Sequence, residues 1–499
     1  MKPLYSFSCP GIRRAVLTSA LGLAVSFVGA IPASAQTGIF RQLSQDSFTD
    51  PSAQHMTEVE PGAFAYGNTI VTAFQVARIS SGGGDDIGWA TSLNGGTTWT
   101  NGYLPGLTIF GGGGTNSAAS DASVAYDAKH GVWLINTLPI ASGVDVAVSR
   151  STDATHWGNP IYISRAGNAD KNWIICDNTS TSPYYGNCYV GWDNSEIQMS
   201  TSSDGGLTWG AAKATAGRDF GIGVNPVVQP NGTVVVGFGD FNGGMSAFTS
   251  TNGGQSWNAA VRISTAPSHG EDGGLRSAGL PSTAIDGAGK VYVSWPDCRF
   301  ESGCTANDIV YSSSTDGVHW SAVVRVPINP INSGVDHFIH GMGIDARTSG
   351  SSAHMAITYY YYPVSACGSS CRLYAGFTLS NDGGQTWTAG RALSGSMQLT
   401  WLPNTFSGRM VADYVATVYP MSGRAFPIYA IALQPTGSLF HQAIYTEGFG
   451  FSSDEMTEQR MSSKDDLPIP GAKSDHPARR PEDRDNELPA QPSNTPPAK

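Results

Sequence analysis

The stretch Ser202-Ser203-Asp204-Gly205-Gly206-Leu207-Thr208-Trp209 decides the fold, because the chain repeats it. An internal repeat at intervals of roughly fifty to seventy residues indicates an architecture built from stacked units. We therefore expect one large domain, although the length alone would allow two or three. Three further full copies run over residues 92–99, 250–257 and 380–387, and two shortened copies run over residues 151–157 and 314–320.

Each position of the repeat has a physical role in a tight turn. The Asp side chain can accept hydrogen bonds from backbone N–H groups just ahead of it. The paired Gly residues supply positive φ without a Cβ clash, and the Trp ring buries a large apolar surface under the turn. The repeat therefore predicts a self-stabilised β-hairpin turn, and its Asp residues are interpreted as fold markers rather than substrate contacts.

The pattern Ser-x-Asp-x-Gly-x-x-Trp resembles the Asp-box, or BNR, repeat of β-propellers in the sialidase-like superfamily, which includes secreted bacterial exo-sialidases. The resemblance implies an all-β propeller. Sialidases resemble six-bladed propellers. The resemblance therefore makes six blades the alternative to the seven that the strand openings of this chain predict.

A second periodicity runs out of phase with the repeated turns, and it consists of a polar residue or Pro, an apolar strand, a turn and another apolar strand. Its recurrence predicts seven four-stranded blades, with the repeated turn between the third and fourth strands. The seventh blade lacks this turn, and we expect residues 38–44 to supply its outer strand and close the ring. The seven openings begin near Glu60, Asp121, Asp170, Asn225, Leu280, His340 and Arg409.

The ends of the chain differ in composition from its centre. Residues 1–35 are predicted to be a signal peptide, because Arg13-Arg14 precede an apolar run and Ala33-Ser34-Ala35 forms a small-residue cleavage site; a retained membrane anchor is the alternative. Residues 36–447 form the predicted propeller. Residues 448–499 are charged and rich in Pro, which predicts a disordered tail.

Charge and export limit the partners of this protein. The net charge of −11 argues against a nucleic-acid or anionic-membrane surface. We expect a secreted or periplasmic monomer with no membrane association after signal cleavage, whose partner is a glycan or glycoconjugate.

Cysteine spacing agrees with export. Cys9 leaves with the signal, and the six others could pair in fifteen ways. Their closeness in sequence predicts nearest-neighbour disulfides in an oxidising compartment. Metal binding is the alternative, but no Cys-x-x-Cys or His-x-x-x-His spacing supports it, so no metal or cofactor is predicted. The predicted bridges are Cys176–Cys188, Cys298–Cys304 and Cys367–Cys371.

Acids, Arg and His gather where the innermost strands are predicted to begin, which is where a propeller places its ligand site. Such a set suits a polar pocket of carbohydrate size, and the alternative is that these side chains hold the blades together. The candidate catalytic residues are Glu60, Asp297, Asp413 and Tyr414. The candidate substrate-binding residues are Arg78, Asp121, Asp170, Arg276, Arg299, His337, His340 and Arg409; Lys171 also lies at an opening.

The family resemblance implies a specific mechanism, in which a Tyr activated by a Glu attacks, an Asp is the acid and three Arg bind the substrate carboxylate. Tyr414 and Glu60 are the matching Tyr and acid. The family's Phe/Tyr-Arg-Ile-Pro motif is absent, and alternation along a strand would place Arg409 and Tyr414 on opposite faces. The matching arginines are Arg276, Arg299 and Arg409, and we expect Arg276 and Arg299 to converge at one mouth of the channel.

Three functions follow as hypotheses. The first is a sialidase-like exo-acting glycoside hydrolase that removes a terminal acidic sugar. The second is a non-catalytic propeller that binds a glycan or a protein, because this fold hosts many functions. The third and weaker alternative is a polysaccharide lyase with His337, His340 or Tyr414 as its base.

Overall fold

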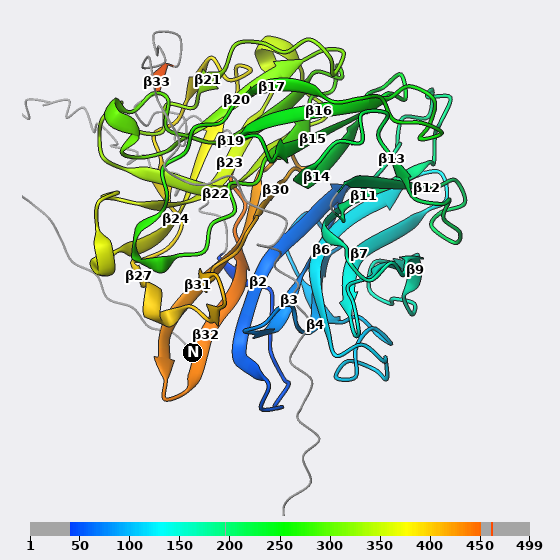
Figure 1. The fold of residues 1–499 in the computed structure, drawn as a ribbon, viewed down its shortest axis with the longest axis horizontal. Helices are drawn as coiled ribbons and strands as arrows, with labels where there is room; N and C mark the ends of the chain where they lie inside the picture. Colours follow the sequence, from blue (N-terminus) through cyan, green and yellow to red (C-terminus); the bar gives the residue numbers. More distant parts are fainter. Residues whose placement is uncertain (1–39, 195, 451–460, 463–499) are drawn as a thin grey trace, which may run out of the picture. The chain divides into compact units, whose positions relative to one another are not determined.

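The computed structural model describes residues 40–194, 196–450 and 461–462 (Figure 1). The predicted signal peptide and most of the predicted tail lie outside these ranges. The described residues form β-strands joined by turns and short 3-10 helices, with no α-helix among them. The prediction of an all-β protein is therefore confirmed.

The strands pair into seven antiparallel units, each of which contains a run of four hydrogen-bonded strands within the described residues. Single residue pairs, Thr57 with Gln442 and Gly84 with Ala119, join the last, first and second units into one longer sheet. The first unit is β2 (Ala53–Tyr66), β3 (Thr69–Ile79), β4 (Gly84–Ser92) and β5 (Thr100–Tyr103). The second is β6 (Ala118–Asp127), β7 (Val132–Ile140), β8 (Val146–Ser151) and β9 (Ile161–Ser164).

The remaining units follow the same pattern along the chain. The third is β10 (Asp170–Cys176), β11 (Cys188–Asp193), β12 (Ile197–Ser202) and β13 (Lys213–Ala214), and the fourth is β14 (Gly221–Val228), β15 (Val234–Asp240), β16 (Gly244–Ser250) and β17 (Val261–Thr265). The fifth is β18 (Ser282–Ile285), β19 (Val291–Asp297), β20 (Asp308–Ser314) and β21 (Val324–Arg325). The sixth is β22 (Asp336–Ile344), β23 (Met355–Tyr362), β24 (Arg372–Ser380) and β26 (Arg391–Ala392), and the seventh is β30 (Ala416–Val418), β31 (Phe426–Thr436), β32 (Leu439–Thr446) and β1 (Arg41–Gln42).

The repeated turns follow the third strand of the first six units. In the copy at residues 202–209, Asp204 Oδ1 accepts hydrogen bonds from the N–H groups of Leu207 and Thr208, both at 3.0 Å. Gly205 and Gly206 have φ values of 74° and 76°, which an L side chain rarely adopts. The local hydrogen bonds therefore stabilise the turn, and Arg150 Nε adds one from the preceding unit by donating to Gly205 O at 2.6 Å.

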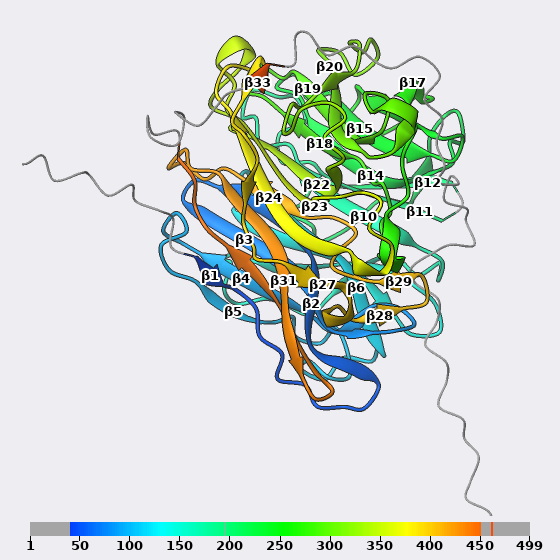
Figure 2. The ribbon, with the colours of Figure 1, turned by 90° about the vertical axis from the view of Figure 1, so that its left-hand side faces the viewer.

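The innermost strands contact one another in sequence, from β2 to β6, β10, β14, β18, β22 and β30, and β30 contacts β2 again. Glycine permits this closeness at some steps. A Cβ on Gly62 would clash with the main-chain oxygen of Ala122, and one on Gly341 would clash with that of Val415. Figures 1 and 2 both show β2 beside the long hairpin of β31 and β32. The first and last units are thus neighbours.

The first described strand completes the last unit, as the sequence predicted. Arg41 and Gln42 of β1 pair with Thr446 and Tyr445 of β32. The folded unit continues past residue 447, because Phe449 is buried and its ring stacks on Phe377 with centroids 4.6 Å apart. Within the predicted tail, β33 (Met461–Ser462) pairs with β25 (Thr386–Trp387).

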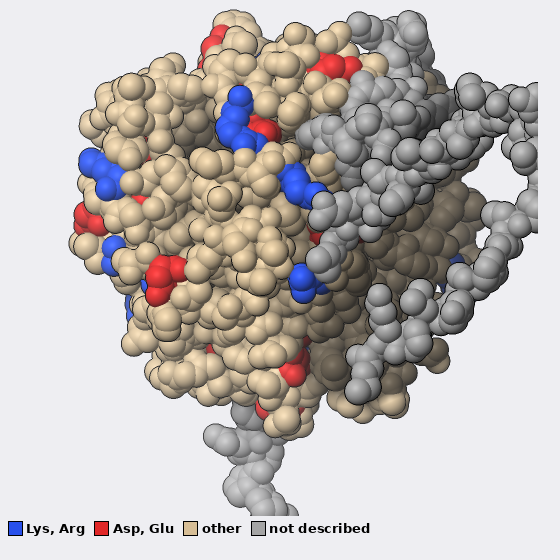
Figure 3. Space-filling view, turned by 180° about the vertical axis from the view of Figure 1, so that it is seen from behind, with Lys and Arg blue, Asp and Glu red and all other residues tan. Residues whose placement is uncertain are grey.

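The three predicted disulfides are all present: Cys176–Cys188, Cys298–Cys304 and Cys367–Cys371. Among the described residues, no helix has the length and apolar character needed to span a bilayer. The face drawn in Figure 3 carries isolated charged side chains among uncharged residues, in agreement with a chain in which only 13% of residues are charged.

Candidate functional site

Bulges in the innermost strands place the central side chains. The antiparallel register shifts between Val59 and Gly62 in β2, and the extra residue there is Glu60, with φ of 54°. The same shift occurs around Asp121 in β6 (φ 48°) and around Lys171 in β10 (φ 42°). Bulges of this kind redirect a side chain out of the ladder and are concentrated near functional sites, as are strained non-glycine residues.

The redirected side chains meet in one buried ion cluster. Lys171 Nζ lies 2.8 Å from Asp413 Oδ2, 3.4 Å from Asp121 Oδ2 and 3.6 Å from Glu60 Oε1. Arg276 Nε donates to Asp413 Oδ1 at 2.9 Å, and its Nη2 lies 3.9 Å from Glu60. None of these five residues is more than 3% exposed. We call Glu60, Asp121, Lys171, Arg276 and Asp413 the central cluster.

Three carboxyl groups face only two cations in the central cluster, and the environment separates the pKa values of two of them. Burial raises the pKa of Glu60 well above its usual value, and Asp121 and Asp413 add to the shift. Burial also acts to raise the pKa of Asp121, but Lys171 and hydrogen bonds from Glu60 and Ser120 outweigh it and hold that pKa below its usual value. With Glu60 protonated, two carboxylates are balanced by two cations.

Neighbouring polar side chains orient the two acids. Gln75 on β3 donates one hydrogen bond to Glu60 Oε2 and another to Ser120 Oγ at 3.1 Å. Ser120 in turn donates to Asp121 Oδ1 at 2.8 Å. The pair of acids is therefore held from two adjacent units. A pair of carboxyl groups whose pKa values are pushed apart can supply both an acid and a base near neutral pH.

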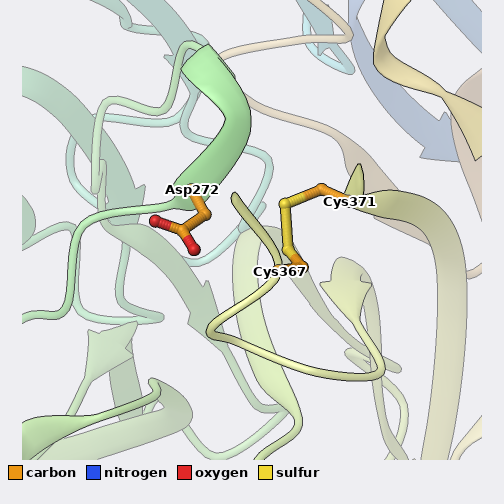
Figure 4. Close-up of side chains that lie close together, drawn as sticks. All are labelled: Asp272, Cys367 and Cys371. Carbon is orange, nitrogen blue, oxygen red and sulfur yellow. A yellow bond between two sulfur atoms is a disulfide. The ribbon is translucent and has the colours of Figure 1, made fainter. Parts of the chain in front are cut away.

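The loop before β18 delivers Arg276 to the central cluster, and it is anchored at both sides. Arg276 N donates to the main-chain oxygen of Arg409 at 2.8 Å. On the other side, Asp272 Oδ2 accepts the N–H of Gly368 at 2.8 Å, in the short loop closed by the Cys367–Cys371 disulfide. Figure 4 shows the Asp272 carboxylate beside this bridge. Because both sulfurs are bonded to each other, they offer no thiolate to a metal ion.

A cavity of about 340 Å³ adjoins the central cluster and is lined by residues of the innermost strands, which places it within the usual size range of small-ligand sites. Lys171 and Tyr414 form part of its wall. Trp173 meets Tyr414 edge to face with ring centroids 5.3 Å apart. Burial, followed by the nearby Glu60, raises the pKa of Tyr414 well above its usual value.

Glu60, Asp121, Arg276, Asp413 and Tyr414, which the sequence predicted, therefore come together from four different units. The alternation argument for Tyr414 does not apply, because no strand spans residues 410–415 and β30 begins only at Ala416. Lys171 at the centre was noted at an opening but was given no role. Its position in the repeat, equivalent to Glu60 and Asp121, was the signal that could have identified it.

Asp297 and Arg299 form a separate pair instead of joining Arg276. Arg299 Nε donates to Asp297 Oδ1 at 2.8 Å, and its Nη2 donates to the main-chain oxygen of Thr265. Asp297 also accepts the indole N–H of Trp295 at 2.7 Å. The two guanidinium groups bind different carboxylates, and Arg299 bonds within the loop pinned by Cys298–Cys304; their convergence at one mouth of the channel stays a prediction.

Replacing Arg299 with Lys should lower the free energy of unfolding by about 1.5–3 kcal/mol, because Lys cannot form the two parallel bonds to the buried Asp297 carboxylate. The affinity for acidic glycans should not change. Urea denaturation and glycan binding, measured on the same variant, separate the two roles. Unchanged stability together with weaker binding would show that Arg299 contacts the glycan instead.

Arg78 and Arg409 bind main-chain oxygens. Arg78 Nη1 donates to the carbonyls of Ile79 and Gly83, both at 2.5 Å, and its Nε lies 3.1 Å from Met410 Sδ. Arg409 Nη1 donates to Leu402 O at 2.9 Å. These contacts place the Arg78 guanidinium on the turn that follows β3, and that of Arg409 on the segment around Leu402.

The remaining predicted residues are also buried, and His340 forms part of the cavity wall. Asp170 accepts the N–H of Lys171 at 2.9 Å and so supports the bulge. His337 contacts Asn329 at 3.0 Å, and burial lowers its pKa to about 3. His340 contacts Ser294 Oγ at 2.8 Å, and burial lowers its pKa to about 4. Imidazoles with such low pKa values are weak bases at neutral pH.

Comparison with known proteins gives only distant structural likeness. No family model matches the chain, and no curated protein matches its sequence. A Hadza microbial sialidase is 13% identical with a TM-score of 0.41, over 80% of this chain and 66% of that one. The intramolecular trans-sialidase of Ruminococcus gnavus is 13% identical with a TM-score of 0.41, over 83% and 98%.

A protein of unknown function from Dyadobacter fermentans is 15% identical with a TM-score of 0.44, over 68% of this chain and 99% of that one. Similarities this low do not transfer an activity or the role of a residue to this chain.

Proposed function

We propose that the chain is an exported seven-bladed β-propeller that hydrolyses the glycosidic bond of a terminal acidic sugar. The observation that carries this proposal is the central cluster beside Tyr414 and the cavity, which joins two acids of opposite protonation, two cations and a phenol. Export is supported by the three disulfides, which are typical of an oxidising compartment.

The blade number is proposed from the seven four-stranded units and from the contacts that link each innermost strand to the next. Pairing β1 with β32 leaves the last unit with four strands, as in the other units. We propose that the protein is a monomer whose partner is a glycan.

Each side chain of the site has a proposed role. Glu60, whose pKa is raised, is the proton donor to the leaving oxygen. Asp121, whose pKa is lowered, is the ionised carboxylate that accepts a proton or stabilises positive charge at the anomeric carbon. Tyr414 is the nucleophile, because a neutral phenol does not repel an anionic substrate: its oxygen bonds to the anomeric carbon as its proton passes to Asp121, and water then cleaves that bond to release the sugar. Lys171 and Arg276 attract the carboxylate of the sugar.

A panel of fluorogenic sialosides, uronosides and neutral glycosides tests the proposal. We expect release of the fluorophore from one or more acidic glycosides and none from the matched neutral ones. Failure to release it from every acidic glycoside would reject hydrolysis as the function.

A non-catalytic glycan-binding propeller is the second candidate, and one observation favours it. Both cations of the central cluster already contact the Asp413 carboxylate, while Trp173 and Tyr414 offer aromatic surface at the cavity. Retention of acidic glycans on an array, without turnover in the panel, would support this function. A lyase is disfavoured because His337 and His340 are weak bases.

A further inference from the structure

A second group of ligating side chains lies outside the central cluster, where the segment before β2 meets the start of β4. Asp50, His55 and Asp85 place one potential ligand atom each within 4.8 Å of one another. Asp50 belongs to the segment before β2, His55 lies on β2 itself and Asp85 lies on β4. The fold therefore joins residues that are up to thirty-five positions apart in sequence.

Asp85 is the informative member of the group. Its exposed fraction is 0%, and in the described part of the chain its carboxyl group contacts the Asp50 carboxyl group but accepts no hydrogen bond from an N–H group or a hydroxyl. Asp50 Oδ2 is also buried without a hydrogen-bond partner. A carboxylate buried without a donor is unfavourable by several kcal/mol or more unless a cation or a proton compensates its charge.

The imidazole of His55 is oriented by a neighbouring acid. His55 Nδ1 lies 3.2 Å from Asp46 Oδ2, and Asp46 is itself fixed by the N–H groups of Phe48 at 2.9 Å and Met56 at 2.6 Å. A carboxylate on Nδ1 is the usual support of a metal-binding histidine, because it leaves Nε2 for the ion. Nε2 here contacts the main-chain oxygen of Asp50, so an ion bound at Nε2 replaces that contact.

We propose that Asp50, His55 and Asp85 bind one divalent metal ion of the zinc or manganese type. Two carboxylates and one imidazole supply the mixed oxygen and nitrogen ligands that these ions accept, whereas calcium prefers oxygen alone. The side chain of His55 is 17% exposed, so the ion can enter from solvent. A bound ion fastens the segment before β2 to β4 and so stabilises the first unit.

The competing arrangement is a proton shared by the two carboxyl groups. Burial, followed by the adjacent Asp50, raises the pKa of Asp85 to about 9 in the metal-free protein. Protonation would neutralise the pair without any ion. An ion and a shared proton occupy the same carboxyl groups, so stoichiometric metal binding distinguishes the two arrangements.

Metal titration of the full-length protein after removal of metal with a chelator tests the proposal. We expect one equivalent of Zn²⁺ or Mn²⁺ to bind in calorimetry and elemental analysis, with a rise in the melting temperature. Asp85→Asn and His55→Ala should each weaken binding at least tenfold. Asp86→Asn is the matched control, because Asp86 is the next residue of β4, is equally buried, and is not among the three ligands.

Two results would overturn the proposal. One is the absence of stoichiometric binding of either ion to the wild-type protein, which leaves the shared proton as the explanation. The other is binding that persists unchanged in His55→Ala and Asp85→Asn, which places the ion elsewhere. If Asp85→Asn does not fold, the wild type and His55→Ala decide between these outcomes.

Discussion

Replacing Asp413 with Ala should lower the free energy of unfolding by about 3 kcal/mol. Asp413 is the carboxylate shared by Lys171 and Arg276, and removing one partner of a buried ion pair leaves the other charge uncompensated. Urea denaturation monitored by tryptophan fluorescence measures the change. An exposed pair provides the control, because Glu196→Ala, which removes the partner of Arg218, should cost less than about 1 kcal/mol.

Glu60 should reduce the loss of unfolding free energy in the Asp413→Ala variant. The Asp413 carboxylate is one reason that the pKa of Glu60 is raised, so its removal allows Glu60 to ionise and balance the second cation. Glu60→Gln cannot ionise. We therefore expect the double variant Glu60→Gln/Asp413→Ala to be less stable than the sum of the single changes by about 1 kcal/mol or more. Strict additivity would show that the two carboxyl groups do not share the charge balance of the central cluster.

Replacing Glu60 with Gln should lower the rate of glycoside hydrolysis by about 10²–10⁴-fold, because Gln has no proton to give to the leaving oxygen. Stability should change little, since the amide replaces a neutral carboxyl group of the same shape. The wild-type rate requires protonated Glu60, so it should fall as pH rises through the raised pKa of Glu60. The residual activity of the Glu60→Gln variant should not show this fall in rate at high pH.

The measurement compares steady-state hydrolysis of the best acidic substrate from the panel across pH, for both proteins. Asp297→Asn is the matched control, since Asp297 is a buried acid with a raised pKa that lies outside the central cluster. It should reduce stability and leave the pH profile unchanged. A Glu60→Gln enzyme with the wild-type rate and profile would remove Glu60 from the chemistry, whatever its effect on folding.

The sequence by itself determined the features that depend on local interactions. The repeated turn is stabilised within eight residues, so Asp204, Gly205 and Gly206 predict it without knowledge of the fold. The disulfides join residues close in sequence, and they were predicted correctly for the same reason. The recurrence of strand openings likewise indicated the units, the outer role of residues 41–42 and the edge at which Glu60, Asp121 and Asp413 lie.

Only the tertiary structure decided which of these side chains meet. The alternation of an ideal strand mispredicts direction wherever an extra residue bulges out, as at Glu60, Asp121 and Lys171. The partner of an arginine is whichever carboxylate the fold brings within reach, so Arg276 joined Asp413 while Arg299 stayed with Asp297. The proposed metal site was invisible in the sequence for the same reason. Asp50 and His55 lie close in sequence across a turn, but Asp85 reaches them only because β3 pairs with both β2 and β4.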